Sequence, residues 1–145
     1  MPGPIDIIGD IHGEISALQQ LLDHLGYNQH GTHPDDRRLV FVGDLVDRGP
    51  SSPAVVELVK KLVEAGRAQC ILGNHELNLL RGDPKDGNEW FMTPDQLGKY
   101  RSEPVTETQK KEFIRFLQDL PLALQRDDLR VAHGRTSEMV GGLRR

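Results

Sequence analysis

Hydrophobic and polar positions follow two alternating patterns over the first half of the chain. Apolar runs at Ile5–Ile8, Arg38–Val42 and Gln69–Leu72 have the length and composition of buried strands. Apolar residues recur at helical spacing in Glu14–Leu25, and again after Ser52, which with the following proline predicts an N-cap and a first helical turn. The order strand, helix, strand, helix, strand predicts parallel strands joined by right-handed crossovers. The stripes expected to face the core are Ile15, Leu18, Leu21, Leu22 and Leu25 in the first helix and Val55, Val59, Leu62 and Val63 in the second.

The second half of the chain is less regular. Residues 81–105 are polar and rich in turns, yet they include Trp90, Phe91 and Tyr100, which fit core packing and a substrate-facing lip equally well. The elements expected after this segment are a helix that begins with a capping box at Thr106 and Gln109, and a hairpin of the strands Leu122–Gln125 and Leu129–Ala132.

Length and composition indicate a single domain. The 145 residues are 37% hydrophobic and 28% charged, which is typical of a globular protein with an aliphatic core. We expect this domain to span residues 1–133, because residues 134–145 show neither strand alternation nor a helical stripe and predict a disordered or aberrant tail. The formal net charge of −4 argues against a protein that coats nucleic acid, which requires a basic face.

The cysteine content and the apolar runs bear on the protein's location. Cys70 is the single cysteine, so no internal disulfide is possible, and its place in a predicted strand favours a core thiol over a reactive one. No run approaches the ~18–20 apolar residues of a membrane span, and the apolar start of the chain is too short for a secretory signal. We therefore expect a cytoplasmic protein that makes no membrane contact.

Three related clusters stand where the predicted strands end. They are GDIHG at residues 9–13, GDLVDRG at residues 43–49 and GNHE at residues 73–76. A single Gly-Asp after a strand is usually only a turn, but the carboxyl ends of parallel strands meet at one edge of a sheet. There, Asp, His and Asn would supply the mixed oxygen and nitrogen ligands that suit Mn, Fe or Zn. A carboxylate on the middle strand can bind two ions at once, an arrangement that serves phosphoryl chemistry.

GDIHG, GDLVDRG and GNHE resemble the signature motifs of the calcineurin-like metallophosphoesterases. The full DRG and NHE forms resemble the branch that contains serine/threonine phosphoprotein phosphatases, their bacterial relatives and symmetrical diadenosine tetraphosphate hydrolase. The resemblance covers residues 5–80 and resumes at RVAH, residues 130–133. It implies an α/β fold, a layered αββα sandwich with a mainly parallel first sheet. It also implies two divalent metal ions, with Mn²⁺ ahead of Fe and Zn.

The resemblance assigns the metal ligands position by position. It implies that Asp10 and His12 bind the first metal and that Asp44 bridges both metals. Asn74 and His133 would bind the second metal, and Asn74 would also contact the substrate.

The resemblance also assigns the remaining catalytic groups. Arg48 would hold a phosphate oxygen, and His75 would protonate the leaving group with Asp47 as its carboxylate partner. Simpler interpretations stay open: Asp47 and Arg48 form a surface pair, and His75 caps the following helix. We expect Glu76 only to favour the positive end of that helix. The histidines expected to lie in solvent are His24, His30 and His33.

The chain departs from the family pattern after His133. The further strands, the later histidine ligand and the second phosphate-binding arginine of the family have no counterpart in residues 134–145. We therefore hypothesise a truncated or frame-shifted chain whose second sheet is largely missing. A weaker second metal site would follow, as would self-association through an uncovered sheet edge.

The function expected from these patterns is metal-dependent hydrolysis of phosphomonoesters by a hydroxide that two metals activate. Phosphoserine or phosphothreonine in a protein, or a small phosphoester, is the expected substrate. One alternative is a hydrolase of the symmetrical diadenosine tetraphosphate type. Another is an inactive metal-binding fragment or pseudoenzyme. The simplest alternative, an ordinary α/β domain with turns at its strand ends, explains three clusters in register poorly.

Overall fold

The computed structural model describes residues 3–96 and 99–133. Sheet A contains three parallel strands in the order β1 (Ile5–Ile8), β2 (Arg38–Phe41) and β3 (Ala68–Cys70). Sheet B is the antiparallel hairpin of β4 (Ala123–Arg126) and β5 (Leu129–Ala132). The helices are α1 (Ile15–Leu25), α2 (Ser52–Glu64), α3 (Asn74–Arg81), the short α4 (Glu89–Met92) and α5 (Glu107–Gln118).

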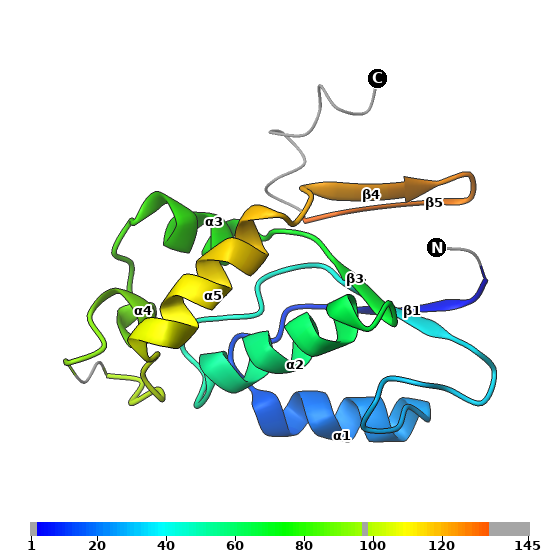
Figure 1. Cartoon of the computed structure of the whole chain (residues 1–145), viewed down its shortest axis with the longest axis horizontal. Helices are drawn as coiled ribbons and strands as arrows, with labels where there is room; N and C mark the ends of the chain where they lie inside the picture. Colours follow the sequence, from blue (N-terminus) through cyan, green and yellow to red (C-terminus); the bar gives the residue numbers. More distant parts are fainter. Residues whose placement is uncertain (1–2, 97–98, 134–145) are drawn as a thin grey trace.

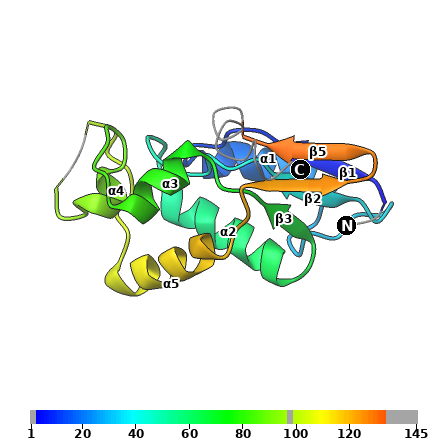
Figure 2. The same cartoon turned by 90° about the horizontal axis from the view of Figure 1, so that it is seen from above.

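The elements form layers, with α1 and α2 on one face of sheet A and the hairpin on the other (Figures 1 and 2). The alternation of side chains along β2 explains this arrangement. Leu39 and Phe41 are fully buried in the cluster with the helices, whereas Val40 packs with Val131 of β5 between the two sheets. The predicted α/β class with a parallel first sheet is confirmed, and in the described part of the chain the second sheet is this hairpin.

Two details of the helices differ from the prediction. Ser51, not Ser52, is the N-cap of α2, and its hydroxyl accepts a hydrogen bond from the Ala54 N–H. Ser52 is fully buried instead, and its Oγ accepts the Asp47 N–H at 2.9 Å. Leu21 is 39% exposed. The buried stripe of α1 is therefore narrower than the sequence suggests, and it centres on Leu18 and Leu22.

His33 was expected in solvent, and this prediction was wrong. It is half-buried, and its Nε2–H donates to the Leu25 carbonyl at 2.8 Å while its ring packs on Tyr27. The Tyr27 hydroxyl donates to Asp6 at 2.6 Å, and the Arg37 guanidinium binds the same carboxylate. The hydrogen bond from Arg37 is the main cause that lowers the pKa of Asp6. This cluster fastens the loop after α1 to the start of sheet A.

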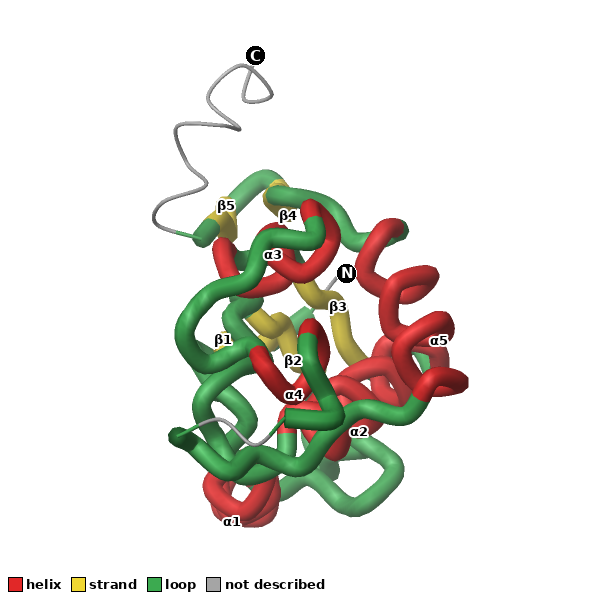
Figure 3. Tube along the Cα trace, turned by 90° about the vertical axis from the view of Figure 1, so that its left-hand side faces the viewer, coloured by secondary structure: helices red, strands yellow, loops and turns green. Residues whose placement is uncertain are grey.

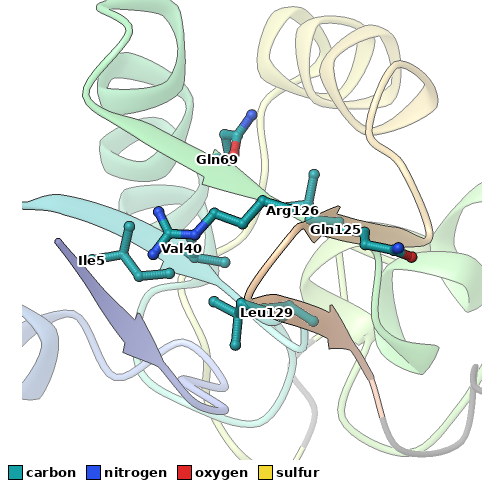
Figure 4. Close-up of a pocket in the computed structure, with 8 residues that line it drawn as sticks. Ile5, Val40, Gln69, Gln125, Arg126 and Leu129 are labelled. Atoms are coloured by element: carbon teal, nitrogen blue, oxygen red, sulfur yellow. The ribbon is translucent and has the colours of Figure 1, made fainter. Parts of the chain in front are cut away.

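A pocket lies between the two sheets and contains none of the predicted site residues. Ile5, Val40 and Leu129 give it an apolar lining, to which Gln69, Gln125 and Arg126 add polar groups. Figure 4 shows Arg126 extending from β4 across this space toward sheet A. We attribute the pocket to sparse packing under a two-stranded hairpin. The predicted tail, residues 134–145, lies outside the described residues. None of the helices in the described ranges has both the length and the apolar character that a membrane crossing requires.

Candidate metal and phosphoester site

The loops that follow β1, β2 and β3 meet at one end of sheet A, beside α3 and α4 (Figure 3). The N–H groups of Ile11 and His12 both donate to the Asp44 carbonyl at 3.0 Å, which fastens the first loop to the second. Gly43 and Gly73 allow the second and third loops to touch. A Cβ on Gly43 would overlap the Gly73 backbone, and a Cβ on Gly73 would overlap the Asp44 carboxylate. Glycine is therefore required where these loops cross.

Asp44 lies at the centre of the site and is 4% exposed. Ligand atoms of Asp10, Asp44 and His133 lie within 4.8 Å of one another, and so do those of His12, Asp44 and His75. Asp44 alone belongs to both groups. The α3 helix points its first turn at this carboxylate, because the His75 N–H donates to Asp44 Oδ1 at 3.0 Å. Two possible ion positions therefore share one buried carboxylate.

The first group brings His133, from the end of β5, against loops of sheet A. Its Nε2 lies 2.6 Å from Asp44 Oδ2 and 3.6 Å from Asp10 Oδ1. The hairpin thus brings a possible metal ligand to Asp44 from 89 positions further along the sequence. Asn74 is the first residue of α3 and is half-buried; it directly precedes His75, whose N–H donates to Asp44.

The second group differs from the set that the resemblance implies, since His12 lies with Asp44 and His75. Its Nε2 is also 3.8 Å from Asp10 Oδ2, so His12 borders both groups. The Val46 carbonyl lies 2.9 Å from His12 Nδ1 and can only accept, so Nδ1 carries the hydrogen. This bond leaves the Nε2 lone pair directed toward the cluster, as in histidines that bind metals. His12 keeps this position with φ +47, a strained value for a residue with a side chain.

The donor chemistry fits divalent metal ions. Carboxylates of Asp10 and Asp44 and imidazoles of His12 and His133 converge here, and Asn74 is the first residue of α3. This mixed oxygen and nitrogen set suits Mn, Fe or Zn and does not select among them.

His75 and Asp47 form a buried pair next to the cluster. The His75 Nδ1–H donates to Asp47 Oδ2 at 2.7 Å, and this bond is the main cause that raises the pKa of His75. Asp47 is fully buried, and its other oxygen accepts the Trp90 Nε1–H at 2.7 Å. Arg48 is exposed beside the pair, and its N–H donates to the Gly87 carbonyl at 3.0 Å. The surface ion pair between Asp47 and Arg48 is therefore not formed.

Glu76 has a larger role than the sequence suggested, and the expectation that it only favours a helix end was wrong. It is fully buried, and its carboxylate accepts the N–H groups of Asp44, Leu45 and Gly73 at 2.7 to 2.9 Å. Burial, followed by repulsion from Asp44, raises the pKa of Glu76 to about 7. Its place at the third position of a helix with a glycine N-cap was the available signal, because such a glutamate reaches back to the cap N–H.

The structure also decides whether the three aromatic side chains of residues 81–105 pack in the core or form a substrate-facing lip. Trp90 and Phe91 are 3% and 1% exposed and belong to the core, so neither forms a lip. Tyr100 is half-buried, and its hydroxyl donates to Asp86 at 3.2 Å. Sequence reasoning missed the bond between Trp90 and Asp47, since no motif connects residues 43 positions apart.

Comparison with known proteins agrees with this geometry. A family model described as calcineurin-like phosphoesterase matches residues 3–145. The bis(5'-nucleosyl)-tetraphosphatase PrpE [asymmetrical] of Geobacillus sp. (strain WCH70) is 41% identical over 89% of this chain and 56% of its own length. The protein of the same name from Bacillus velezensis is 40% identical over 88% of this chain and 55% of its own length. The chain thus spans about half the length of these curated relatives.

Solved structures show the same fold. The crystal structure of a putative diadenosine tetraphosphatase has a TM-score of 0.59 and 31% identity, covering 89% of this chain and 49% of that one. A cold-active protein-tyrosine phosphatase of a Shewanella species has a TM-score of 0.62 at 21% identity, covering 99% of this chain and 47% of its own. A serine/threonine phosphatase from Saccharomyces cerevisiae has a TM-score of 0.53 at 24% identity, covering 82% and 33%. At these lower identities the last two show the fold alone.

Proposed function

The chain belongs to the calcineurin-like phosphoesterase family, and from this premise we propose that it hydrolyses phosphate esters or anhydrides, with a dinucleoside polyphosphate as substrate. The single observation that carries the proposal is the shared carboxylate of Asp44 beside the buried pair of His75 and Asp47. The names of the relatives at 40–41% identity support the nucleotide substrate. This choice reverses the order that the motifs alone suggested.

The residues proposed to hold metal ions are those gathered around Asp44. When bound, two ions there would supply Lewis-acid polarisation of a phosphoryl group and of a water molecule. The chain's own contribution is to fix the ligands before any ion arrives. The ligands proposed are Asp10, His12, Asp44, Asn74 and His133.

His75 is proposed to move the proton and Arg48 to bind the phosphate. Because the Nδ1–H of His75 is committed to Asp47, the second proton of the charged imidazolium lies on Nε2, from which it can pass to a leaving oxygen. The raised pKa of His75 keeps this protonated form present to higher pH than in a free imidazole. The exposed guanidinium of Arg48 can bind two phosphoryl oxygens in parallel.

A serine/threonine phosphatase activity remains the second candidate, because the DRG and NHE forms of the second and third motifs favour it. The two substrates differ in the group that leaves. A phosphopeptide releases an alcohol of high pKa, which needs a proton to leave, whereas a dinucleoside polyphosphate releases a nucleotide whose phosphate is a good leaving group as an anion.

The test compares substrates and one matched pair of variants. Purified protein with Mn²⁺ is given diadenosine tetraphosphate, a phosphothreonine peptide and p-nitrophenyl phosphate, and the products are separated by chromatography. We expect ATP and AMP from the nucleotide, whereas ADP alone would indicate symmetrical cleavage. Asp44→Asn should abolish turnover, and Asp23→Asn, which alters an exposed carboxylate of α1, should not. Metal binding without turnover of any substrate would contradict the proposal and identify a binding module.

A further inference from the structure

The carboxylate of Asp47 has two partners, of which the proposed mechanism uses one. Oδ2 accepts the His75 Nδ1–H and Oδ1 accepts the Trp90 Nε1–H, both at 2.7 Å. The side chain is 1% exposed, so water does not compete for either oxygen. The backbone of the same residue is held separately, because its N–H donates to Ser52 Oγ. With the backbone fixed, the two donors, the indole of Trp90 and the imidazole of His75, set how the carboxylate is turned about its last bond.

Trp90 is itself held firmly. Its side chain is 3% exposed, and its ring packs edge-on against Phe91 with 5.3 Å between the ring centroids. Its carbonyl accepts the Val105 N–H at 2.9 Å. Asn88, which is 1% exposed, closes the preceding turn by accepting the Lys85 N–H and donating to the Asp83 carbonyl. Because packing and backbone hydrogen bonds hold Trp90 in place, its indole can orient the carboxylate of Asp47, whereas the more flexible carboxylate cannot orient the indole.

The same segment places Arg48. The Gly87 carbonyl accepts the Arg48 N–H at 3.0 Å, and a Cβ on Gly87 would come within 2.7 Å of Arg48 Cγ. Gly87 also has φ +99, a conformation that glycine adopts readily and other residues do not. Residues 83–90, here called the clamp segment, therefore contact both neighbours in the second motif, Asp47 and Arg48.

We propose that Trp90 is a positioning residue, which holds the Asp47 carboxylate in the orientation that His75 requires for proton transfer. The clamp segment that carries Trp90 holds Arg48 at the same time, so it aligns the proton donor and the phosphate-binding group together. This inference rests on the proposed function for its catalytic consequence, but the hydrogen bond itself can be tested without any activity. Removal of the indole N–H leaves a buried carboxylate oxygen without its donor, and the carboxylate is then free to turn away from His75.

The first experiment observes the hydrogen bond directly in metal-free protein. The chain contains one tryptophan, so its proton NMR spectrum has a single indole N–H signal. We expect this signal to lie downfield and to exchange slowly with solvent. Asp47→Asn, which replaces the charged acceptor with a weaker neutral one, should move it upfield, whereas Asp10→Asn should leave it in place. An indole signal that Asp47→Asn does not move would overturn the proposal.

The second experiment uses leaving groups of different basicity. p-Nitrophenolate leaves without a proton, whereas phenolate leaves far more readily once it is protonated, so the turnover of phenyl phosphate reports on the acid. Trp90→Phe, which keeps the ring and loses the donor, should lower kcat for phenyl phosphate about tenfold and kcat for p-nitrophenyl phosphate less than about threefold. KM should stay unchanged for both substrates.

Phe91→Leu is the matched control, because it loosens the same aromatic contact and removes no hydrogen bond. It should leave the ratio of the two kcat values as in the wild type. Equal losses with both substrates in Trp90→Phe, or an altered ratio in Phe91→Leu, would show that Trp90 only supports the fold. A wild-type protein that hydrolyses neither substrate would refute the proposed function, and the NMR experiment would still decide whether Trp90 holds Asp47.

Discussion

Replacing Glu76 with glutamine isolates the contribution of a buried carboxylate that touches no substrate. The change keeps the size of the side chain and alters only its acceptors. In the wild type, Oε1 accepts the N–H groups of Asp44 and Gly73, and Oε2 accepts that of Leu45. A glutamine can keep the first two bonds through its single oxygen, but its NH₂ group then faces the Leu45 N–H, so that two donors oppose each other.

The magnitude follows from this mismatch and from the pKa. One lost hydrogen bond that leaves a buried N–H unpaired costs about 1–3 kcal/mol. The carboxyl form of Glu76 avoids this loss, because its hydroxyl oxygen still accepts. The pKa rises from 4.5 in the unfolded chain to about 7 in the folded protein, so ionisation of Glu76 costs stability as the pH rises through this interval. The total cost to the wild type is about 3 kcal/mol. Glutamine does not ionise, so the deficit of Glu76→Gln should be largest at or below about pH 4.5, should shrink as the pH rises to about 7, and should then stay constant.

Urea unfolding followed by the fluorescence of the single tryptophan measures this difference, in metal-free buffer at pH 4.5, 6 and 8. At pH 4.5 we expect a loss of about 2 kcal/mol in the free energy of unfolding, or roughly 4–8 °C in Tm. The control Glu64→Gln removes an exposed carboxylate paired with Lys60 and should cost less than about 0.5 kcal/mol at every pH. A deficit for Glu76→Gln that grows with pH, or one at pH 4.5 no larger than that of the control, would refute the reasoning.

Three further predictions concern the site and the sheet edge. Asp47→Asn replaces the charged acceptor that raises the pKa of His75 with a weaker neutral one, so the alkaline limb of the activity profile should move to lower pH. A limb that stays in place would exclude His75 as the titrating acid. Titration calorimetry with Mn²⁺ should show two sites, and Asn74→Ala should weaken one of them only. A titration that Asn74→Ala leaves unchanged would exclude Asn74 as a ligand. Ile7 is 48% exposed on β1, an edge strand of sheet A among the described residues, so light scattering should detect dimers at high concentration, and Ile7→Lys should abolish them. A wild-type protein that stays monomeric would contradict self-association through this strand.

The sequence predicted the parts of the fold that depend on local periodicity. The apolar runs located all three strands of sheet A within a few residues, and the capping box at Thr106 placed the start of α5, because both signals arise from neighbours in the chain. The strand Ala68–Cys70 ends two residues earlier than expected. Beyond it, Leu72 donates its N–H to the Pro121 carbonyl instead of to a strand. Only the tertiary structure determines such a boundary.

The site was predictable where residues share a motif, and it was not where they meet across the fold. The second motif places Asp44 and Asp47 within four residues, and parallel strands bring the motifs together. Glu76 and Trp90 act through contacts 31 to 43 positions away, which no local pattern records. Their burial could not be inferred either, since a glutamate at a helix start is ordinarily exposed.

These distant contacts explain how the second motif keeps an unfavourable backbone. Asp44, Asp47 and Arg48 have φ values of +49, +79 and +76, a region that costs non-glycine residues about 1–3 kcal/mol each. The N–H group of each is satisfied by a different acceptor: the Glu76 carboxylate, the Ser52 hydroxyl and the Gly87 carbonyl, respectively. The strained loop therefore owes its shape to α3, α2 and the clamp segment rather than to its own sequence. Because each acceptor belongs to a different element, the carboxylate proposed to bind metal, the partner of the proposed acid and the arginine proposed to bind phosphate are aligned only when α2, α3 and the clamp segment are all folded.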